Sequence, residues 1–573
     1  MSDRGLSSRF SKLNPFSKLR TDPEDQGEAI TNETVGGGHP AQPTRLDKNA
    51  LRVSHALKSY LASQNVLSEA EAGLDSEGNT AALEELLNKP HVKVPAEITD
   101  LSHPLPEYFI SSSHNTYLLA HQLYGESSTE AYATALRTGA RCVEIDAWDD
   151  EEHPMSPKVT HGYTLASHIH FSSVCETIRD IVDEEAAAPS DINPAPILIS
   201  LENHCGPQGQ KRLAEIMRET WQHRLLGEPV TQQGTEEQSG SDQHVKLSQL
   251  GSKIAVIVEF HIANEKEDSS SSESEDDDTE HQQMKKAKKE EAKSVTVPEL
   301  AELGVYAQSV KPSDHSWLTG NLTNGPHHHL INVSESGLKG LMAESSPQIG
   351  KHNQQHLMRV YPKGTRISSK NLNPVPFWGV GAQITALNWQ SYDASMQLNA
   401  SLFEGSNGFV LKPPALRSGG SGNITENSRR RNLTLHVAGA SDIPIPPDRE
   451  GKEIKPYVTA TLLHPGDLSG EPPKRKTSGY KPHKLGMLHK GENPPASDPV
   501  WDEKLEWEYD DNELTFLRIL IKSDDSFAAN PVLAVAAIRI LYVVEGWCFV
   551  RMLDLKGRET HCTLLVRFSF EKP

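Results

Sequence analysis

The spacing of hydrophobic residues changes along this chain, and each change predicts a different kind of structure. Residues 51–100 show a helical period, with Leu83, Leu86 and Leu87 on one face and Pro90 as a stop. From about residue 105, helical patterns alternate with short apolar runs, which read YFISSSH, CVEIDAWD, PILISLENHC and KIAVIVEF. Strand and helix in repetition over this length predict an α/β fold whose parallel sheet closes into a barrel.

The last part of the chain, residues 429–573, has a different pattern. Short strands of period two are separated by turn signals and read NLTLHVAGA, PYVTATLLH, VWDEKLEWEY, FLRILIKSDD and HCTLLVRFSF. Such strands predict an all-β sandwich.

Two local signals refine the helical regions. In the helix expected after the first barrel strand, Ser127 and Glu130 have the spacing of a capping box, and Gly139 suits the helix end. Near the amino end, Asp75 begins a stretch that resembles a calcium-binding loop. Its Gly78 comes three residues later instead of five, and no Glu closes the loop, so residues 51–100 are predicted to be a vestigial EF-hand-like segment.

Three polar segments separate these regions. Residues 1–50 are rich in Ser, Pro, Gly and Thr and predict a disordered basic and polar arm. Residues 262–297 contain EKEDSSSSESEDDDTE, nine acidic residues with one lysine, and predict a disordered acidic linker. The third segment, residues 418–428, contains SGGSGN and predicts a flexible linker.

The opening of the basic arm interleaves Arg and Lys with Phe and Leu, in MSDRGLSSRFSKLNPFSKLR. Such a mixture can contact anionic lipid. An ordinary disordered arm and a transit peptide are the alternatives, and Pro15 interrupts any continuous helix.

Composition narrows the class of protein. The 573 residues include 57 Lys and Arg and 78 Asp and Glu, a net charge of −21 that argues against nucleic acid as a partner. The five cysteines form no CxxC pair, which argues against a disulfide framework or a cysteine zinc site. No apolar run reaches the ~18 residues of a membrane span, and no signal peptide opens the chain. These features favour a cytoplasmic protein.

Polar residues of catalytic type stand at the ends of the barrel strands. His114 and Asn115 follow the first apolar run, and His161 follows another strand and precedes a glycine. Glu144 and Asp146 are two residues apart and therefore share one face of a strand, while Val143, Ile145 and Ala147 point the other way; Glu202 ends a further run. Parallel barrels place their active sites at the carboxyl ends of strands, so these side chains are expected to converge.

The residue types suit one kind of chemistry. Oxygen ligands alone, from Asn115, Glu144, Asp146 and Glu202, suit calcium or magnesium better than zinc. Two imidazoles could donate or accept protons at a phosphorus whose charge the metal stabilises. From this pattern alone, solvated strand faces and a metal-dependent phosphodiesterase both remain open.

Longer motifs carry a resemblance to a known family. The segments SSSHNTYLL, STEAYATALRTGARCVEIDAWD, HGYT and SLENHC resemble the X-box of eukaryotic phosphoinositide-specific phospholipase C. MRVYPKGTRISSKNLNPVPFWGVGAQITALNWQ and GSNGFVLKPPALR resemble its Y-box, and residues 429–573 are similar to its C2-type module. The resemblance implies a shortened, delta-like, lower-eukaryotic form. Its TIM barrel would be split by the acidic linker into halves at 105–261 and 298–417.

The family resemblance also implies roles for individual residues. Calcium would be held by Asn115, Glu144, Asp146 and Glu202 and would acidify the inositol 2-hydroxyl, whose attack on phosphorus gives a cyclic phosphodiester that water then opens. His114 would stabilise the pentavalent phosphate, His161 would protonate the diacylglycerol oxygen, and Glu144 would be the base. The substrate-binding residues implied are Asn332, Arg359 and Tyr361.

The chain departs from the family pattern at several positions. Ile257 and Glu259 stand where the family usually offers lysines to the ring phosphates, which predicts a weakened preference for the bisphosphate; a shifted alignment is the alternative. Leu123, Tyr163 and Leu165 match an apolar membrane ridge or are ordinary packing residues, while another ridge position is Thr365. In the C2-type module, Lys455 and Ser523 replace expected acids, so calcium binding there is doubtful.

One further run is unexplained by the resemblance. His327, His328 and His329 are consecutive, which suggests a metal-binding tract; a buried approach to a strand or a chance surface run is the alternative.

The expected function is that of a calcium-dependent phospholipase C acting on phosphoinositide lipids, as a monomer associated peripherally with membranes, with an upstream activator that the sequence does not identify. A catalytically silent lipid-binding scaffold is the alternative from another class, and the Y-box argues against another barrel phosphodiesterase such as a glycerophosphodiester hydrolase.

Overall fold

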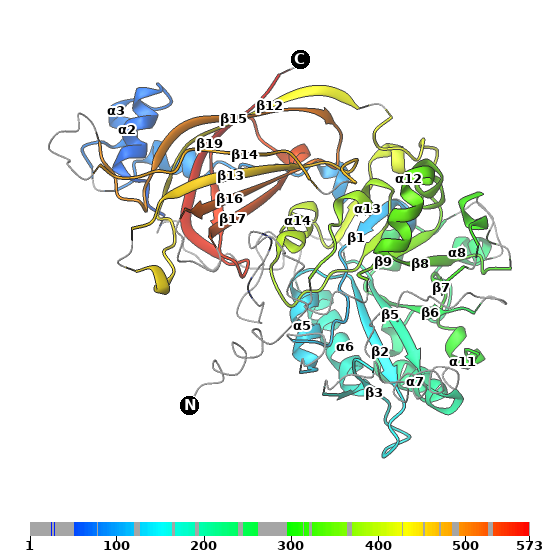
Figure 1. The fold of residues 1–573 in the computed structure, drawn as a ribbon. Coiled ribbons are helices and arrows are strands. Elements are labelled where there is room, and N and C mark those ends of the chain that lie inside the picture. Colours follow the sequence, from blue (N-terminus) through cyan, green and yellow to red (C-terminus); the bar gives the residue numbers. More distant parts are fainter. Residues whose placement is uncertain are drawn as a thin grey trace, which may run out of the picture.

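The structure is a computed structural model with two main bodies, a barrel and a β-sandwich (Figure 1). It describes residues 25, 28, 51–76, 78–119, 126–162, 167–188, 194–238, 244–261, 295–312, 314–319, 322, 324–363, 370–426, 428–450, 453–468, 471–483, 492–524 and 531–571. The acidic run predicted at 265–280 lies outside these residues, as does all of the basic arm except Asp25 and Glu28.

Eight parallel strands form the barrel. In spatial order they are β1 (Tyr108–Ile110), β10 (Ile384–Thr385), β9 (Leu357–Tyr361), β8 (His329–Ser334), β7 (Gln308–Val310), β6 (Ile254–Glu259), β5 (Ile197–His204) and β2 (Cys142–Trp148). A parallel bridge between Ser112 and Cys142 joins the two ends of this row, so the sheet is closed. The predicted TIM barrel is confirmed.

Three short strands extend the barrel sheet beyond the eight. β11 (Phe409–Leu411) pairs antiparallel with β1, and the antiparallel strands β3 (Lys158–Val159) and β4 (Ile169–His170) follow β2.

Helices cover the outside of the barrel. They are α5 (Thr129–Arg137), α6 (Phe171–Ala187), α7 (Pro207–Trp221), α8 (Gln232–Gln238), α9 (Leu247–Leu250), α11 (Pro298–Ala301), α12 (Glu335–His352), α13 (Val375–Gly379) and α14 (Ala394–Leu402). Short 3-10 turns lie at Ala96–Thr99, Leu105–Glu107, Gln222–Arg224, Ser316–Thr319, Pro414–Leu416, Pro447–Arg449 and Ile540–Tyr542.

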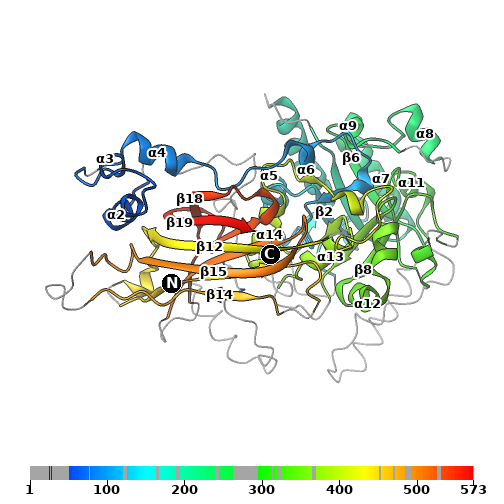
Figure 2. The same cartoon turned by 90° about the horizontal axis from the view of Figure 1, so that it is seen from above.

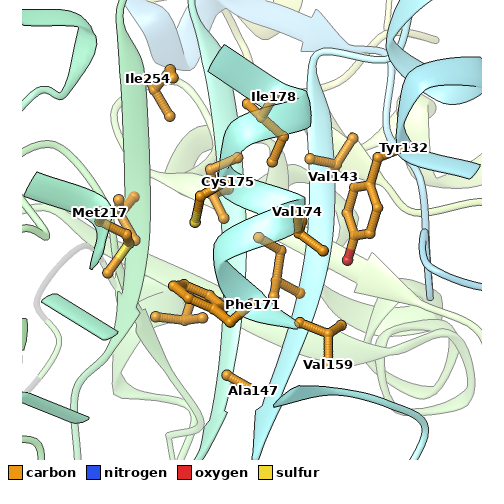
Figure 3. Packing of buried hydrophobic residues seen from close by; sticks show 14 of the residues in the cluster. Tyr132, Val143, Ala147, Val159, Phe171, Val174, Cys175, Ile178, Met217 and Ile254 are labelled. Atoms are coloured by element: carbon orange, nitrogen blue, oxygen red, sulfur yellow. The ribbon is translucent and has the colours of Figure 1, made fainter. Parts of the chain in front are cut away.

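The two faces of β2 show how the pattern of period two builds the barrel wall. Val143, Ile145 and Ala147 belong to a buried apolar cluster that includes Phe171 and Val174 of α6 (Figure 3). The intervening residues, Glu144 and Asp146, therefore point to the barrel interior. Apolar packing on the outer face thus holds two carboxylates on the inner face.

The capping box predicted at Ser127 and Glu130 is wrong, because the N-cap of α5 is the next residue. Ser128 is the N-cap, and its hydroxyl accepts a hydrogen bond from the backbone N–H of Glu130. Ser127 instead exchanges hydrogen bonds with Ser167: its backbone N–H donates to the Ser167 hydroxyl, and its own hydroxyl donates to the Ser167 carbonyl. Gly139 follows the helix with φ 106°, a conformation that favours glycine.

The eight strands of the second body are all antiparallel. In spatial order they are β14 (Lys474–Lys476), β13 (Pro456–Leu463), β16 (Phe516–Ser523), β17 (Val532–Arg539), β18 (Gly546–Leu553), β19 (Glu559–Glu571), β12 (Arg429–Ser441) and β15 (Val500–Asp511). β17 and β18 share the single pair Val535 and Leu553, so the row divides there into two four-stranded sheets. The predicted C2-type sandwich is confirmed.

The helices at the amino end pack on the sandwich, which the sequence did not predict. Figure 2 shows α2 (His55–Ser63), α3 (Glu69–Ala72) and α4 (Ala81–Asn88) at the end of the sandwich far from the barrel. Leu57 and Leu83 are fully buried in a cluster with Phe549 and Leu565 of the sandwich. This segment is therefore part of the same folded body.

The loop after α3, rejected as a calcium loop, surrounds a lysine. The Lys58 ammonium donates to the carbonyl oxygens of Gly73, Ser76 and Gly78 at 3.4, 3.3 and 2.7 Å. Carbonyl oxygens that would suit a metal ion thus bind a cation of the chain itself.

The barrel and the sandwich share a packed interface. Arg518 of β16 donates to the side chain of Gln397 in α14 at 2.7 Å, and the Tyr542 hydroxyl donates to the Leu402 carbonyl at 3.0 Å. The segment predicted as a flexible linker is also held, because Gln354 donates to the carbonyl oxygens of Ala415 and Gly420. Among the described helices, none is long and apolar enough to cross a bilayer.

Removing the Leu57 side chain tests the docking of the amino-terminal helices. Leu57→Ala should lower the free energy of unfolding by about 2–5 kcal/mol, because it leaves a cavity in a buried apolar cluster. Urea denaturation measures this change. The exposed residue Glu85 supplies the control Glu85→Ala, which should change little; an equally small effect of Leu57→Ala would show that the helices are not docked.

Candidate active site

The carboxyl ends of the barrel strands surround a mouth lined by polar side chains. Deeper in the barrel the inward positions are apolar, including Ile110, Leu198, Leu330, Leu357 and Ile384. Two or four residues further along the same strands or the loops that follow, the inward positions are His114, Glu202, Asn332, Arg359 and Asn388. One apolar layer therefore supports a polar layer, as the sequence pattern predicted.

His114 is positioned from two sides. Its backbone N–H donates to the Leu387 carbonyl at 2.7 Å, and its Nδ1 lies 2.9 Å from Oδ1 of Asn388. Asn388 is itself held by Asn371, which exchanges two hydrogen bonds with the Asn388 backbone. Burial and the charge of Arg359 lower the pKa of His114 to about 4, while the bond to Asn388 raises it. The resting imidazole is therefore neutral.

The four predicted oxygen ligands lie together. The Asn115 backbone N–H donates to Glu144 Oε2 at 2.7 Å, in a turn where Asn115 has φ 46°. The Tyr117 hydroxyl donates to Asp146 Oδ2 at 2.7 Å and lies 3.2 Å from Asn115 Oδ1. Glu202 lies opposite Asp146 in the pairing of β5 with β2 and shares a hydrogen bond with Glu144. The structure thus brings all four residues to one side of the mouth.

Burial and mutual repulsion control the protonation of these carboxyls. Burial raises the pKa of Glu144 to about 8, although Arg359 opposes the shift. Burial and the charges of Glu202 and Glu144 raise the pKa of Asp146 well above its usual value. For Glu202, burial also acts upward, but Arg359 and Lys311 outweigh it and lower the pKa to about 2. Without a metal ion, protons on Glu144 and Asp146 and the charges of Arg359 and Lys311 therefore offset the negative charge of the site.

The donor set fits a hard divalent cation. Asp146 Oδ1 is buried and has no hydrogen-bond partner among the described residues. Ligand atoms of Asp146, Glu202 and His204 already lie within 4.8 Å of one another. Three carboxylates with an amide oxygen are ligands that calcium prefers, so the residues present fit the expected ion.

His161 lies on the same side of the mouth, where Glu202 acts on its pKa. Burial lowers the pKa of His161 and the Glu202 charge raises it. A side chain at Gly162 would collide with the Trp148 ring, since a Cβ there would lie 1.9 Å from that ring. Trp148 in turn stacks on His204 with centroids 4.1 Å apart. Glycine after His161 is thus required by packing.

Arg359 is a buried cation at the centre of the mouth. Its guanidinium forms an ion pair with Glu144, donates to Asn332 Oδ1 at 3.2 Å and lies 3.8 Å from Glu202. Its guanidinium carbon lies 5.8 Å from the centroid of the Tyr361 ring. The three predicted substrate-binding residues are therefore adjacent. Arg359 also places its positive charge beside the carboxyl groups of Glu144 and Glu202.

Ile257 and Glu259, which stand where the family usually has lysines, lie in different surroundings. Ile257 is buried in the apolar layer, with 2% of its surface exposed, whereas Glu259 ends β6 at the mouth. Burial and the Glu202 charge raise the pKa of Glu259, and Lys311 lowers it. Only Glu259 is thus placed to act on a substrate.

Sequence reasoning missed Asn388, His204 and Lys311. His204 follows Glu202 by two residues, so the same period that paired Glu144 with Asp146 could have placed it. Lys311 follows the three-residue strand β7, which gave no apolar run to mark it. The partnership of Asn388 with His114 joins residues 274 positions apart, and no local pattern reveals it.

Two further groups of positions were singled out in the sequence, the expected membrane ridge and two loop residues of the C2-type module. The ridge residues Leu123, Tyr163 and Leu165, and Thr365 with them, lie outside the described residues. In the sandwich, the Lys455 backbone N–H donates to the Ser523 hydroxyl at 3.1 Å, and the Asp524 N–H donates to the Lys455 carbonyl at 3.1 Å. Lys455 and Ser523, which replace the expected acids, are therefore joined by a hydrogen bond.

Comparison with known families matches three regions of the chain. Residues 101–260 match the X domain of phosphatidylinositol-specific phospholipase C, residues 300–415 match its Y domain, and residues 431–547 match the C2 domain.

Several characterised proteins are similar over most of the chain. A 1-phosphatidylinositol 4,5-bisphosphate phosphodiesterase of Dictyostelium discoideum is 31% identical over 515 residues, which cover 82% of this chain and 60% of the relative. The delta-1 enzyme of Rattus norvegicus is 30% identical over 82% of this chain and 61% of its own length. The chain thus spans about three fifths of the length of these relatives. Among solved structures, PLC21 of L. pealei shares the fold, with a TM-score of 0.66 and 21% identity over 100% of this chain and 69% of that protein.

The buried carboxyls make the stability of the metal-free protein depend on pH. Because folding raises the pKa of Glu144 and Asp146, the folded state holds protons that the unfolded chain has lost above pH ~4. That stabilisation falls by about 1.4 kcal/mol per pH unit for each such proton above pH ~4, and for Glu144 the fall ends near the folded pKa of about 8, above which both states have lost the proton. Glu202 acts in the opposite direction, but below pH ~4.

Urea denaturation between pH 6 and 9 should therefore show stability falling with pH in chelator, and a flatter profile in calcium. Asp146→Asn should reduce the slope, and Asp180→Asn, at an exposed position, should leave it unchanged. A slope that calcium does not alter would contradict this account of the site.

Proposed function

Since the chain belongs to the eukaryotic phosphoinositide-specific phospholipase C family and resembles its delta-type members, we propose that it is a calcium-dependent phosphoinositide phospholipase C. It would cleave phosphatidylinositol phosphates into diacylglycerol and inositol phosphates through a cyclic phosphodiester.

The convergence at the mouth is the observation that carries this proposal. Oxygen ligands from three chain segments meet beside His114, whose pKa responds to Glu202, Arg359 and His161. An inactive scaffold has no need to keep buried carboxyls and a buried arginine together, because each buried charge costs stability unless it is balanced. The scaffold therefore has less support than the enzyme.

Calcium would be held by Asn115, Glu144, Asp146 and Glu202, and His204 is a further candidate ligand. When bound, the ion supplies positive charge that stabilises the phosphate and acidifies the attacking hydroxyl.

The protein groups have separate tasks in the proposed reaction. Glu144 is the base that takes the proton of the inositol 2-hydroxyl, a role that a raised pKa suits. His114, held at Nδ1 by Asn388, uses Nε2 to stabilise the charged phosphate. His161 protonates the leaving diacylglycerol oxygen and then takes a proton from the water that opens the cyclic product.

The headgroup would lie against Arg359, Tyr361 and Asn332. A planar guanidinium suits a ring phosphate, and the Tyr361 ring beside it offers a flat surface for the inositol. Glu259 opposes a further phosphate, although Lys311 offsets part of its charge. We therefore propose a weakened preference for the bisphosphate over phosphatidylinositol.

The proposal includes where the protein acts. A phospholipid substrate requires contact with a membrane surface, which a C2 domain in this family is suited to make. We propose that the protein is a cytoplasmic monomer that binds membranes peripherally. It would not bind nucleic acid, and its activator is still to be identified.

Release of water-soluble inositol phosphates from liposomes tests the enzyme. Turnover should require calcium and should fall about 10²–10⁴-fold in His114→Ala and in His161→Ala, because each removes a group that acts in the transition state. His315→Ala, at an exposed position, should retain full activity. Folded wild-type protein that releases no product, with calcium present, would favour the scaffold.

Charge reversal at Glu259 tests the headgroup preference. Glu259→Lys should raise turnover of the bisphosphate relative to phosphatidylinositol by roughly tenfold or more, since a change of about 1.4 kcal/mol in one charge interaction gives that ratio. Matched liposomes of each lipid give the ratio of turnover. Glu344→Lys, at an exposed position of α12, is the control. A strong bisphosphate preference of the wild type would contradict the proposal.

A further inference from the structure

Three histidines meet at the end of the barrel opposite the mouth. His329 is the first residue of β8, His352 is the last residue of α12, and His356 follows one helical turn later, with its N–H donating to the His352 carbonyl at 3.0 Å. Both His329 and His352 are 4% exposed. We call these three residues the histidine cluster.

The rings of the cluster are in direct contact. Nε2 of His329 lies 2.9 Å from Nε2 of His352. The His356 ring stacks on His329 with centroids 3.9 Å apart, and its centroid lies 5.1 Å from that of His352. A contact of 2.9 Å between two nitrogens requires something positive between them, because two lone pairs at that distance repel.

The neighbours of His352 determine where its proton lies. Its Nδ1 is 2.9 Å from Oδ1 of Asn353. The Asn353 amide cannot be reversed, because its Nδ2 donates to the Val380 carbonyl at 2.9 Å. Oδ1 can only accept, so Nδ1 of His352 carries the proton and Nε2 of the neutral ring presents a lone pair.

The same reasoning applies to His329. Its Nδ1 lies 3.2 Å from the carbonyl oxygen of Pro326, which can only accept. Nδ1 therefore carries the proton, and Nε2 of this neutral ring also presents a lone pair. The two lone pairs face each other at 2.9 Å.

An extra proton could lie between the two nitrogens, but the surroundings oppose it. The resulting imidazolium would be buried, and the described residues place no carboxylate in hydrogen-bond contact with either ring. The amino group of buried Lys412, which donates to the carbonyl of Asn353 next to His352 at 2.8 Å, provides no negative charge. A buried charge without a counter-ion is costly.

We propose that His329 and His352 bind a divalent transition-metal ion of the zinc class through their Nε2 atoms. Ligating histidines usually donate their other ring N–H to a carbonyl or carboxylate oxygen, and both Nδ1 atoms here do so. Imidazole ligands suit zinc and its neighbours, and a pair spaced by four residues on one helical turn is a common zinc-binding arrangement. His356 is in that position relative to His352 and can turn to supply a third nitrogen.

The site needs a small opening to accept the ion. Zinc–nitrogen bonds of about 2.05 Å place two tetrahedral ligands roughly 3.4 Å apart, so the pair must separate by about half an ångström from its 2.9 Å contact. An adjoining cavity of about 20 Å³, lined by His328, His356, Glu237 and Tyr306 among others, gives room for about one water molecule to complete the coordination.

The ion would link strand β8 of the barrel to helix α12, which follows it. His329 begins one strand and His352 ends the helix that follows it, so a shared ion ties both ends of this strand–helix unit. It is a structural site, separate from the calcium ligands at the mouth, and accounts for a histidine in the run His327–His329 that the proposed reaction does not use.

Zinc titration of the full chain, with calcium present in excess, tests the proposal. Calorimetry should show one zinc ion per chain, with affinity at least tenfold weaker in His329→Gln and in His352→Gln. His327→Gln changes the exposed neighbour in the same run and should bind as the wild type does. Asp146→Asn should also retain zinc, because it alters only the mouth.

Cobalt provides a measurement that needs no variant to fold. Cobalt bound by imidazoles in a tetrahedral site should give visible absorption bands that zinc abolishes, and zinc should raise the melting temperature of the wild type. Absence of the bands, zinc binding that both cluster variants leave unchanged, or an equal loss in His327→Gln would each overturn the proposal.

Discussion

Four carboxyl groups converge at the barrel mouth, and the need to balance their charge determines the rest of the site. Glu144, Asp146, Glu202 and Glu259 interact with one another and with Arg359 and Lys311. Buried carboxylates in this number stay ionised only beside cations, and otherwise hold protons. The raised pKa values of Glu144 and Asp146 show that the chain's own cations are insufficient. The proposed divalent ion would supply positive charge here, and the oxygen ligands suit calcium.

The barrel holds these repelling groups in place by packing on the other side of its wall. Val143 and Ile145 lie among apolar side chains of the covering helices, and this burial sets the face on which Glu144 and Asp146 stand. The sandwich braces the barrel through α14, where Gln397 accepts from Arg518. The amino-terminal helices, with Leu57 buried against Phe549, extend the same body. Stability gained in these apolar layers offsets the cost of charge at the mouth.

Much of this arrangement could be predicted from local patterns. Strand ends in the sequence placed His114, Glu144, Asp146 and Glu202 at one mouth, because the period of a strand and the polarity of a parallel barrel leave little freedom. Contacts between distant segments could not be predicted. Examples are the hold of Asn388 on His114 and the docking of Leu57 on the sandwich, which depend on three-dimensional packing. The capping box failed for a related reason, since Ser127 is recruited by Ser167, forty residues away.

The most direct test of the account is a crystal structure of the protein grown with calcium, with the ion located by its anomalous scattering. The account predicts one ion at the mouth, bound by oxygens of Asn115, Asp146, Glu144 and Glu202, with Asp146 Oδ1 among its ligands. An empty mouth at a saturating calcium concentration, with Asp146 Oδ1 still unpartnered, would contradict the claim that these carboxyls are held together for a cation.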